Sequence, residues 1–222
     1  MISRELIDFL IHLRENNYKE WFHENKSTYQ RVRKEYEQFV ALIIAQIAQF
    51  DDSVKYLTPK DCIFRINRDI RFSKDKSPYK TNFGAFIAPG GRKSGYAGYY
   101  FHLEPDSSFL AGGIYMPSSQ ALKSIRTEIY HHAEELKNII YDQKFKEFFG
   151  GFTEMDKLKV GPKDFPKDFE DIDLLKHKHF TVSRMIPGEI LHSEELMDFL
   201  MESYQAVYPL NRFLNEAIDH GA

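Results

Sequence analysis

The stretch "GYAGYYFHLEPDSSFLAGGIYMPSS" (residues 95–119) decides the fold that the sequence predicts. Two runs within it, residues 96–104 and 108–116, alternate in hydrophobicity with a period of two, which is typical of β-strands. The turn residues of "EPDSS" (104–108) leave only a tight link between them, so the two strands form an antiparallel pair. A helix begins at "PSS" (117–119), because proline suits the first helical turn and serine caps it.

Two more strands are expected before this pair, at residues 62–72 and 83–88. The segment "APGGRKSG" (88–95) joins the second expected strand to the third through a hairpin. The sequence therefore predicts a meander of about four antiparallel strands. A fifth strand is expected later in the chain, near residues 179–186.

The remaining apolar positions recur with the 3.6-residue period of helices. The fold class predicted is α+β, a central antiparallel sheet packed with N-terminal, middle and C-terminal helices in a single domain, residues 1–222. Residues 156–170 hold two prolines and a glycine among charges and predict an irregular connection. Helices are expected at residues 3–15, 27–50, 117 to about 140, a shorter one ending at Gly150–Gly151, 170–176 and 193–219.

Composition narrows the class of protein. With 42% hydrophobic and 28% charged residues, the chain has the balance of a globular protein. A formal charge of −3 disfavours a protein that coats nucleic acid by bulk electrostatics. Cys62 is the single cysteine, which excludes an internal disulfide and favours the reducing cytoplasm, and we expect it to be buried and unreactive. The sequence predicts no signal peptide and no membrane segment.

The stretch "FRINRDIRFSKDKSPYKTNFG" (64–84) gathers positive charge, with six basic and two acidic residues. In an extended strand, Arg65 and Arg71 share the polar face, and Asp69 lies one same-face step from Arg71 alone. Arg68 falls on the apolar face, where either a β-bulge rotates it outward or a buried acid pairs with it. The surplus charge indicates a pocket for an anion.

Arginine offers a planar fork to a phosphate or carboxylate, and lysine offers a movable point charge. Arg126 joins the predicted site because it lies about two turns beyond Ser118, in a helix whose first amides are free to bind an anion. The anion-binding residues expected are Arg65, Arg68, Arg71, Lys74, Lys76, Ser77, Lys80 and Arg126. The equally weighted alternative is a solvated loop with a ladder of ion pairs.

Two pairs of side chains that include histidine have the spacing of metal ligands on a strand. His102 and Glu104 share one face of an expected strand, and His177 and His179 share another, but neither pair has a third ligand at a motif spacing. The sequence therefore predicts no metal and no cofactor. It also shows no nucleophile–base pair at a recognisable spacing, so no reaction is assigned, and the question of whether the chain is an enzyme stays open.

With these residues in view, the chain resembles a conserved hypothetical family, domain of unknown function number 2461. The most specific match is "IFRINRDIRFSKDKSPYKTNFGAF" (63–86), an arginine-rich segment that runs into "RFSKDKSPYK". The resemblance implies one α+β domain and brings no established activity, substrate or catalytic residue. Supporting matches are "NNYKEWFHENKSTY" (16–29), "GYYFHLEP" (98–105), "FLAGGIYMP" (109–117) and "DLLKHKHF" (173–180).

Three functions stay open at this point. The first is a protein that binds an anionic small molecule in the basic pocket. The second is a nucleic-acid-binding accessory protein that uses the same basic segment with exposed tyrosines. The third is a non-catalytic interaction protein whose arginines and Asp69 form an internal network. The sequence assigns no oligomeric state.

Overall fold

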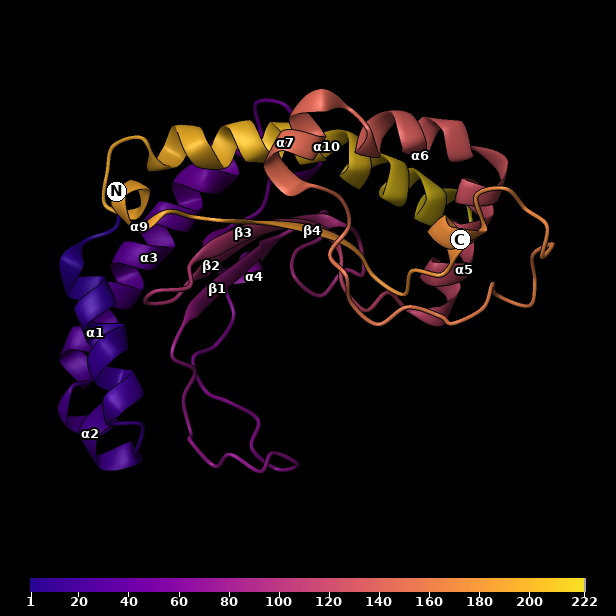
Figure 1. Cartoon of the computed structure of the whole chain (residues 1–222). Coiled ribbons are helices and arrows are strands. Elements are labelled where there is room, and N and C mark those ends of the chain that lie inside the picture. Colours follow the sequence, from indigo (N-terminus) through magenta and orange to yellow (C-terminus); the bar gives the residue numbers. More distant parts are fainter. Residues whose placement is uncertain (222) are drawn as a thin grey trace.

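The computed structural model describes residues 1–221, so the last residue of the expected 1–222 domain lies outside the described residues. A four-stranded antiparallel sheet forms the centre, in the order β1 (Phe83–Ile87), β2 (Gly98–Leu103), β3 (Phe109–Ile114) and β4 (Phe180–Met185). Helices from the N-terminal, middle and C-terminal parts of the chain pack with it (Figure 1). The predicted α+β class is confirmed.

Each strand pairs with its neighbour in sequence order, as a meander requires. In register, Phe101 of β2 lies opposite Ala85 of β1 and Leu110 of β3. Arg184 of β4 lies opposite Leu110 on the other side of β3. The expected strands at 83–88, 96–104, 108–116 and 179–186 are confirmed as β1 (Phe83–Ile87), β2 (Gly98–Leu103), β3 (Phe109–Ile114) and β4 (Phe180–Met185).

Most helices lie where the periodicity places them. The expected helix through residue 140 is an exception, because the chain leaves helical geometry at His132 and forms two helices instead of one. Three short helices, α2 (Lys19–Glu24), α4 (Pro59–Cys62) and α9 (Gly188–Leu191), were not predicted, since helices of four to six residues show little periodicity. The helices are α1 (Arg4–Glu15), α2 (Lys19–Glu24), α3 (Lys26–Ile47), α4 (Pro59–Cys62), α5 (Ser119–His131), α6 (Ala133–Ile140), α7 (Gln143–Phe149), α8 (Ile172–Leu175), α9 (Gly188–Leu191) and α10 (Leu196–His220), with a 3₁₀ turn at Asp52–Val54.

The predicted strand at 62–72 is wrong. Residues 64–82, which we call the arm, form an irregular loop that folds back on itself, with one isolated bridge between Asn67 and Tyr79. The carboxylate of Asp75 accepts the Ser77 amide at 2.9 Å, and Asp69 accepts the Arg71 amide at 3.3 Å. Such local side-chain bonds to the backbone compete with a strand ladder, so the aspartates turn a chain that its alternating pattern would extend.

The two faces of the sheet differ. Tyr99, Phe101 and Leu103 of β2 are buried, on the face where α3 and α10 pack. Helix α10 comes so close that a Cβ on Gly112 would lie 2.7 Å from Val207. The opposite face is partly open, and there Met185 is 60% exposed. In Figure 1, α10 lies above the sheet and the arm hangs below it.

Two further findings bear on the sequence predictions. Among residues 1–221, no helix combines the length and the apolar character that a membrane crossing requires. Cys62 is fully buried, so the expected burial of this cysteine is confirmed, and desolvation raises the pKa of its thiol to about 12.

Candidate functional site

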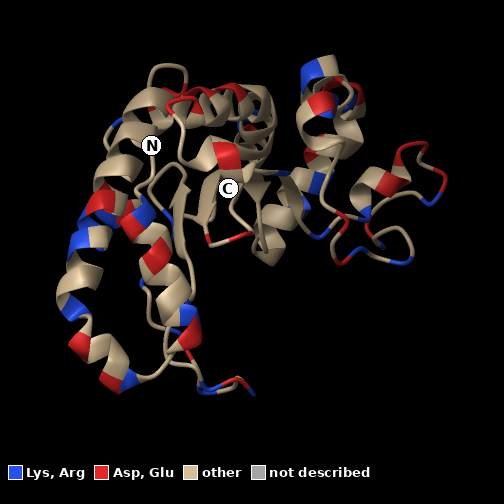
Figure 2. Cartoon of the chain, turned by 60° about the vertical axis from the view of Figure 1, so that its left-hand side comes forward, with Lys and Arg blue, Asp and Glu red and all other residues tan. Residues whose placement is uncertain are grey.

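The arm has a tip and a base that differ in their electrostatics. We define the tip as residues 69–76 and the base as residues 64–66 and 80–82. The base is tied across the arm by a hydrogen bond from the Lys80 amide to the Ile66 carbonyl at 2.8 Å, and to β1 by one from the Phe64 amide to the Gly84 carbonyl at 2.9 Å. Figure 2 shows the arm projecting from the body with charges of both signs near its end.

Two arginines of the arm are neutralised within it. Arg71 forms an ion pair with Asp69 at 2.7 Å. Arg68 pairs with Asp75 and also donates to the Ser77 carbonyl at 3.2 Å. Of the two alternatives for Arg68, an acid partner is therefore found, although Asp75 is exposed rather than buried.

The remaining groups of the tip hold its shape. The Lys76 ammonium donates to the Ile70 carbonyl at 3.0 Å, and the Ser77 hydroxyl donates to Asp75 at 2.6 Å. Lys74 is exposed. These contacts resemble the internal network of the third functional alternative more than a set of groups facing one ligand.

The base of the arm carries two cations, Arg65 and Lys80, that form no ion pair within the arm. Within residues 1–221, no carboxylate oxygen lies within 4.0 Å of Arg65 or Lys80. The Lys80 ammonium lies 5.3 Å from the centre of the Phe64 ring. Desolvation lowers the pKa of Lys80, and the charge of Arg65 lowers it further, so the two cations are neighbours. Hydrogen bonds from Arg71 lower the pKa of Asp69, and the charge of Arg65 also lowers it, but this carboxylate lies beyond ion-pair distance of Arg65 and is paired with Arg71.

Arg126 does not join them. Its guanidinium donates to the His177 carbonyl at 3.0 Å, and its buried Nε has no hydrogen-bond partner among the described residues. His177 precedes β4, whereas the arm leads into β1, and these strands form opposite edges of the sheet. The structure therefore separates Arg126 from the other predicted site residues.

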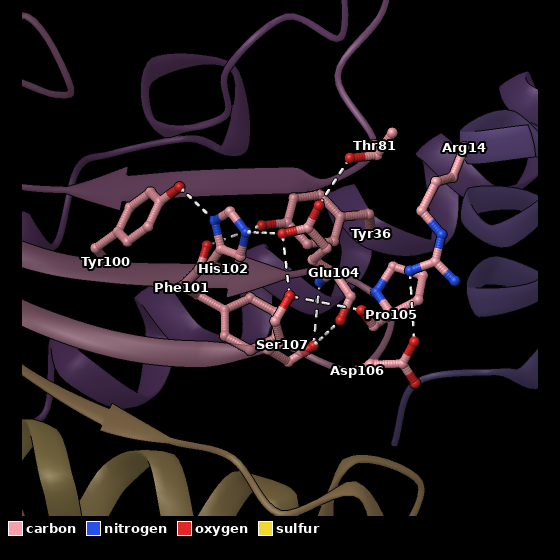
Figure 3. Close-up of polar contacts among 11 residues, drawn as sticks. Arg14, Tyr36, Thr81, Tyr100, Phe101, His102, Glu104, Pro105, Asp106 and Ser107 are labelled. Atoms are coloured by element: carbon pink, nitrogen blue, oxygen red, sulfur yellow. Dashed lines mark hydrogen bonds and ion pairs between the residues drawn. The ribbon is translucent and has the colours of Figure 1, made fainter. Parts of the chain in front are cut away.

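Beside the base of the arm, three side chains of β2 and the turn after it form a hydrogen-bonded relay (Figure 3). The Tyr100 hydroxyl lies 2.9 Å from His102 Nδ1, and His102 Nε2 lies 3.2 Å from Glu104 Oε2. The Thr81 hydroxyl donates to Glu104 Oε1 at 2.7 Å, and the Ser107 hydroxyl donates to Oε2 at 3.1 Å. We call Tyr100, His102 and Glu104 the relay.

The relay lies on the partly open face of the sheet. Residues 100, 102 and 104 alternate with the buried core positions of β2, so all three side chains point away from α3 and α10. The ring of His102 stacks on Phe109 of β3, with centroids 4.5 Å apart. Phe64 at the base of the arm meets Tyr100 edge to face, with centroids 6.3 Å apart.

A comparison with known proteins places the chain in a family. A family profile described as "Conserved hypothetical protein (DUF2461)" matches residues 5–213 of the 222. The chain belongs to the DUF2461 family. No curated protein and no solved structure matches it. The matched range includes the arm and the relay, and the family description names no activity.

The pKa shifts in this DUF2461 protein define the protonation of the relay. Desolvation raises the pKa of Glu104, but hydrogen bonds from Thr81, His102 and Ser107 outweigh it, and the net pKa is lowered. Glu104 is thus a carboxylate at neutral pH and can only accept. Desolvation lowers the pKa of His102, whose ring is therefore neutral, with its proton on Nε2 facing Glu104. The free lone pair on Nδ1 then accepts a hydrogen bond from the Tyr100 hydroxyl.

Two members of the relay, His102 and Glu104, are evident in the sequence, whereas Tyr100 was not predicted. His102 and Glu104 were recognised as neighbours on one strand face but were weighed only as metal ligands. Among residues 1–221, no cluster of three or more histidine, cysteine, aspartate or glutamate side chains is placed to hold a metal. The signal for Tyr100 was the same period of two, which puts residues 100, 102 and 104 on one face.

Gly84 of this DUF2461 chain makes room for the relay. A Cβ at this position would lie 2.7 Å from the Tyr100 hydroxyl, so we expect Gly84→Ala to displace the phenol and break its bond to His102. The clash is with the end of a side chain, so we expect the free energy of unfolding to fall by less than about 1.5 kcal/mol.

Long-range ¹H–¹⁵N NMR spectra of the histidine side chains check this prediction, because the Nδ1 resonance of His102 should shift when its hydrogen bond is lost. Gly188→Ala is the control, since a Cβ there would meet nothing within 4 Å. A His102 spectrum that is the same in both variants would contradict the prediction.

Proposed function

We propose that this protein binds a small molecule through a phosphate or carboxylate group at the base of the arm, where Arg65 and Lys80 hold the anion. The observation that supports the proposal is the pair of neighbouring cations with no carboxylate within 4.0 Å in the described chain. Every other arginine and lysine assigned to the arm site, except the exposed Lys74, has a partner in the arm itself.

The energetics favour an added counter-charge. Lys80 is half-buried, and burial without a partner already lowers the pKa of its ammonium. A bound anion would restore that stability, because a charge-assisted hydrogen bond contributes about 1.5–3 kcal/mol in a partly desolvated position. Arg68, Arg71, Lys76 and Ser77 then keep the arm folded rather than contact the ligand, and Lys74 adds to the positive potential.

Isothermal titration with inorganic phosphate, followed by a panel of phosphorylated metabolites and carboxylic acids, tests the site. We expect binding in the wild type and at least about tenfold weaker binding in the double variant Arg65→Gln, Lys80→Gln, which corresponds to about 1.4 kcal/mol. Glutamine removes the charge and keeps a polar side chain that is shorter than arginine or lysine.

The matched control is Arg71→Gln, Lys76→Gln, which removes two charges from the tip of the same arm. If both double variants lose affinity equally, the effect is general electrostatics and the proposed site is overturned. The same conclusion follows if no anion in the panel binds the wild type.

One observation favours a second candidate, a protein that binds single-stranded nucleic acid. Phe72 at the tip is 95% exposed, and the Arg71 guanidinium lies 5.9 Å from its ring centre. Exposed aromatic rings beside cations are the platforms on which unpaired bases stack. This candidate predicts that the protein binds a short single-stranded oligonucleotide and that the affinity falls steeply with salt. If Phe72→Ala abolishes that binding, the result favours this candidate over the small molecule.

A further inference from the structure

The relay has the order of groups that enzymes use to move a proton. A hydroxyl meets a ring nitrogen, and the second ring nitrogen meets a carboxylate (Figure 3). In catalytic triads the carboxylate fixes the tautomer and stabilises the imidazolium that forms, while the imidazole accepts the hydroxyl proton. The distances of 2.9 and 3.2 Å in this chain allow His102 to accept the Tyr100 proton while Glu104 stays hydrogen-bonded to the second ring nitrogen.

Each member of the relay is held in position from outside it. Glu104 receives the Thr81 and Ser107 hydroxyls, and the two bonds orient both carboxylate oxygens. The His102 ring is fixed by its stack on Phe109, and the absence of a side chain at Gly84 leaves room for the phenol. The cluster is therefore preorganised, on a sheet face that the helices of the core leave partly exposed.

We propose that Tyr100, His102 and Glu104 form an acid–base triad that takes a proton from a hydroxyl or amino group of the molecule whose anionic group is bound by Arg65 and Lys80. The inference rests on the proposed function, because the anion site supplies the orientation of the substrate. Tyr100 is the member that contacts the substrate, His102 is the base, and Glu104 is a positioning residue.

The proton transfer balances without any further reactant. The substrate proton passes to the Tyr100 oxygen while the phenolic proton passes to His102 Nδ1, so the phenol stays neutral. The products are a deprotonated substrate atom and an imidazolium beside the Glu104 carboxylate. Burial, together with the charge of Glu104, raises the pKa of Tyr100 to about 12, so a free phenolate is not the reactive species at neutral pH and the histidine is required.

The charges around His102 couple the triad to the anion site. Glu104 at the end of its own strand favours the imidazolium, whereas Lys80 from the arm disfavours it. The phenol of Tyr100 is the remaining titratable group in contact with the ring among the described residues. An anion bound at Lys80 would neutralise the opposing charge, so ligand binding would make His102 a stronger base.

Benzenesulfonyl fluoride tests the triad without knowledge of the substrate. In the labelling step the Tyr100 oxygen forms a bond to sulfur, fluoride leaves with the electron pair of the S–F bond, and the phenolic proton moves to His102 Nδ1. Peptide mass spectrometry gives the rate for each tyrosine in one sample. Tyr56, which is 87% exposed and has no hydrogen bond to a histidine within residues 1–221, is the internal control for an exposed phenol.

We expect Tyr100 to react at least about tenfold faster than Tyr56 at pH 7.5 in spite of its lower exposure. In His102→Asn the Tyr100 rate should fall by about a hundredfold while the Tyr56 rate stays constant, which is the low end of the range for general-base catalysis. Glu104→Gln keeps the shape of the carboxylate and should also slow Tyr100, which guards against a folding defect in the histidine variant.

The outcomes separate the two proposals. If Tyr100 is labelled fast and the rate depends on His102, the triad is supported. If inorganic phosphate then leaves that rate unchanged, the result counts against the anion site. The triad is overturned if Tyr100 is labelled no faster than Tyr56. It is also overturned if His102→Asn and Glu104→Gln leave the Tyr100 rate unchanged, and the effect of phosphate does not alter either conclusion.

Discussion

Replacement of Gly113 by alanine is expected to lower the free energy of unfolding by about 4 kcal/mol or more, which is at the upper end for single substitutions. Gly113 has a φ of +104°, and a Cβ there would lie 1.9 Å from the Phe180 carbonyl oxygen on β4. The obstacle is backbone, so β4 must move and its ladder with β3 must break. Urea denaturation followed by circular dichroism measures the loss.

Gly95 provides a matched control for this prediction. It has a φ of +84°, but a Cβ there would meet nothing within 4 Å. Gly95→Ala should therefore cost only the conformational penalty of a left-handed residue, about 1–2 kcal/mol. Equal losses in the two variants would show that the clash with Phe180 is unimportant and that the prediction is wrong.

Acid is expected to destabilise the protein through His177, and His177→Phe should remove that part of the pH dependence. The ring is 6% exposed and packs against Phe152 and Phe180 at 5.0 and 5.8 Å between centroids. Desolvation, followed by the charge of Lys157, lowers the pKa of His177 to about 4.

The sign follows from the protons bound in each state. Between pH 6.5 and pH 4 the unfolded chain protonates His177 and the folded chain does not, so the free energy of unfolding falls as the pH falls. A difference of about 2.5 pH units corresponds to about 3 kcal/mol across this window. Urea titrations at several pH values should show a shallower slope in His177→Phe.

The exposed His131 serves as the control for the histidine variant. His131→Phe should follow the wild-type pH dependence, because His131 is exposed and lies outside the core. A slope in His177→Phe that equals the wild type would contradict the assignment of the acid sensitivity to this ring.

The comparison of sequence with structure shows which signals carry the fold. Long amphipathic segments predicted α1, α3 and α10, and alternation predicted the four strands of the sheet, since burial on one face imposes a period directly on the sequence. Alternation also predicted a strand in the arm, where it is wrong. There Asp69 and Asp75 bind nearby backbone amides, and this local competition does not appear in a hydrophobic pattern.

The candidate site could be predicted only in part, for a related reason. The basic residues were evident, but their partners depend on the turns that the arm makes, so the neutralisation of Arg68 by Asp75 was not foreseen. Arg126 was added because of its spacing from Ser118 at a helix N-terminus, which does not reveal that its guanidinium contacts His177, just before the edge strand opposite β1. The relay needs Thr81 and Ser107 from outside β2, and such convergence is a property of the folded chain.

The alternation along β2 has a consequence for how the protein tolerates sequence change. Odd positions such as Phe101 are buried in the core, whereas even positions such as His102 face the open side of the sheet. Point substitutions at the even positions can therefore change the open side while the molecule still folds. Insertion or deletion of one residue exchanges the two sets at once. Diversity at this strand should therefore accumulate by replacement at constant length, and directed evolution of the open side can follow the same route.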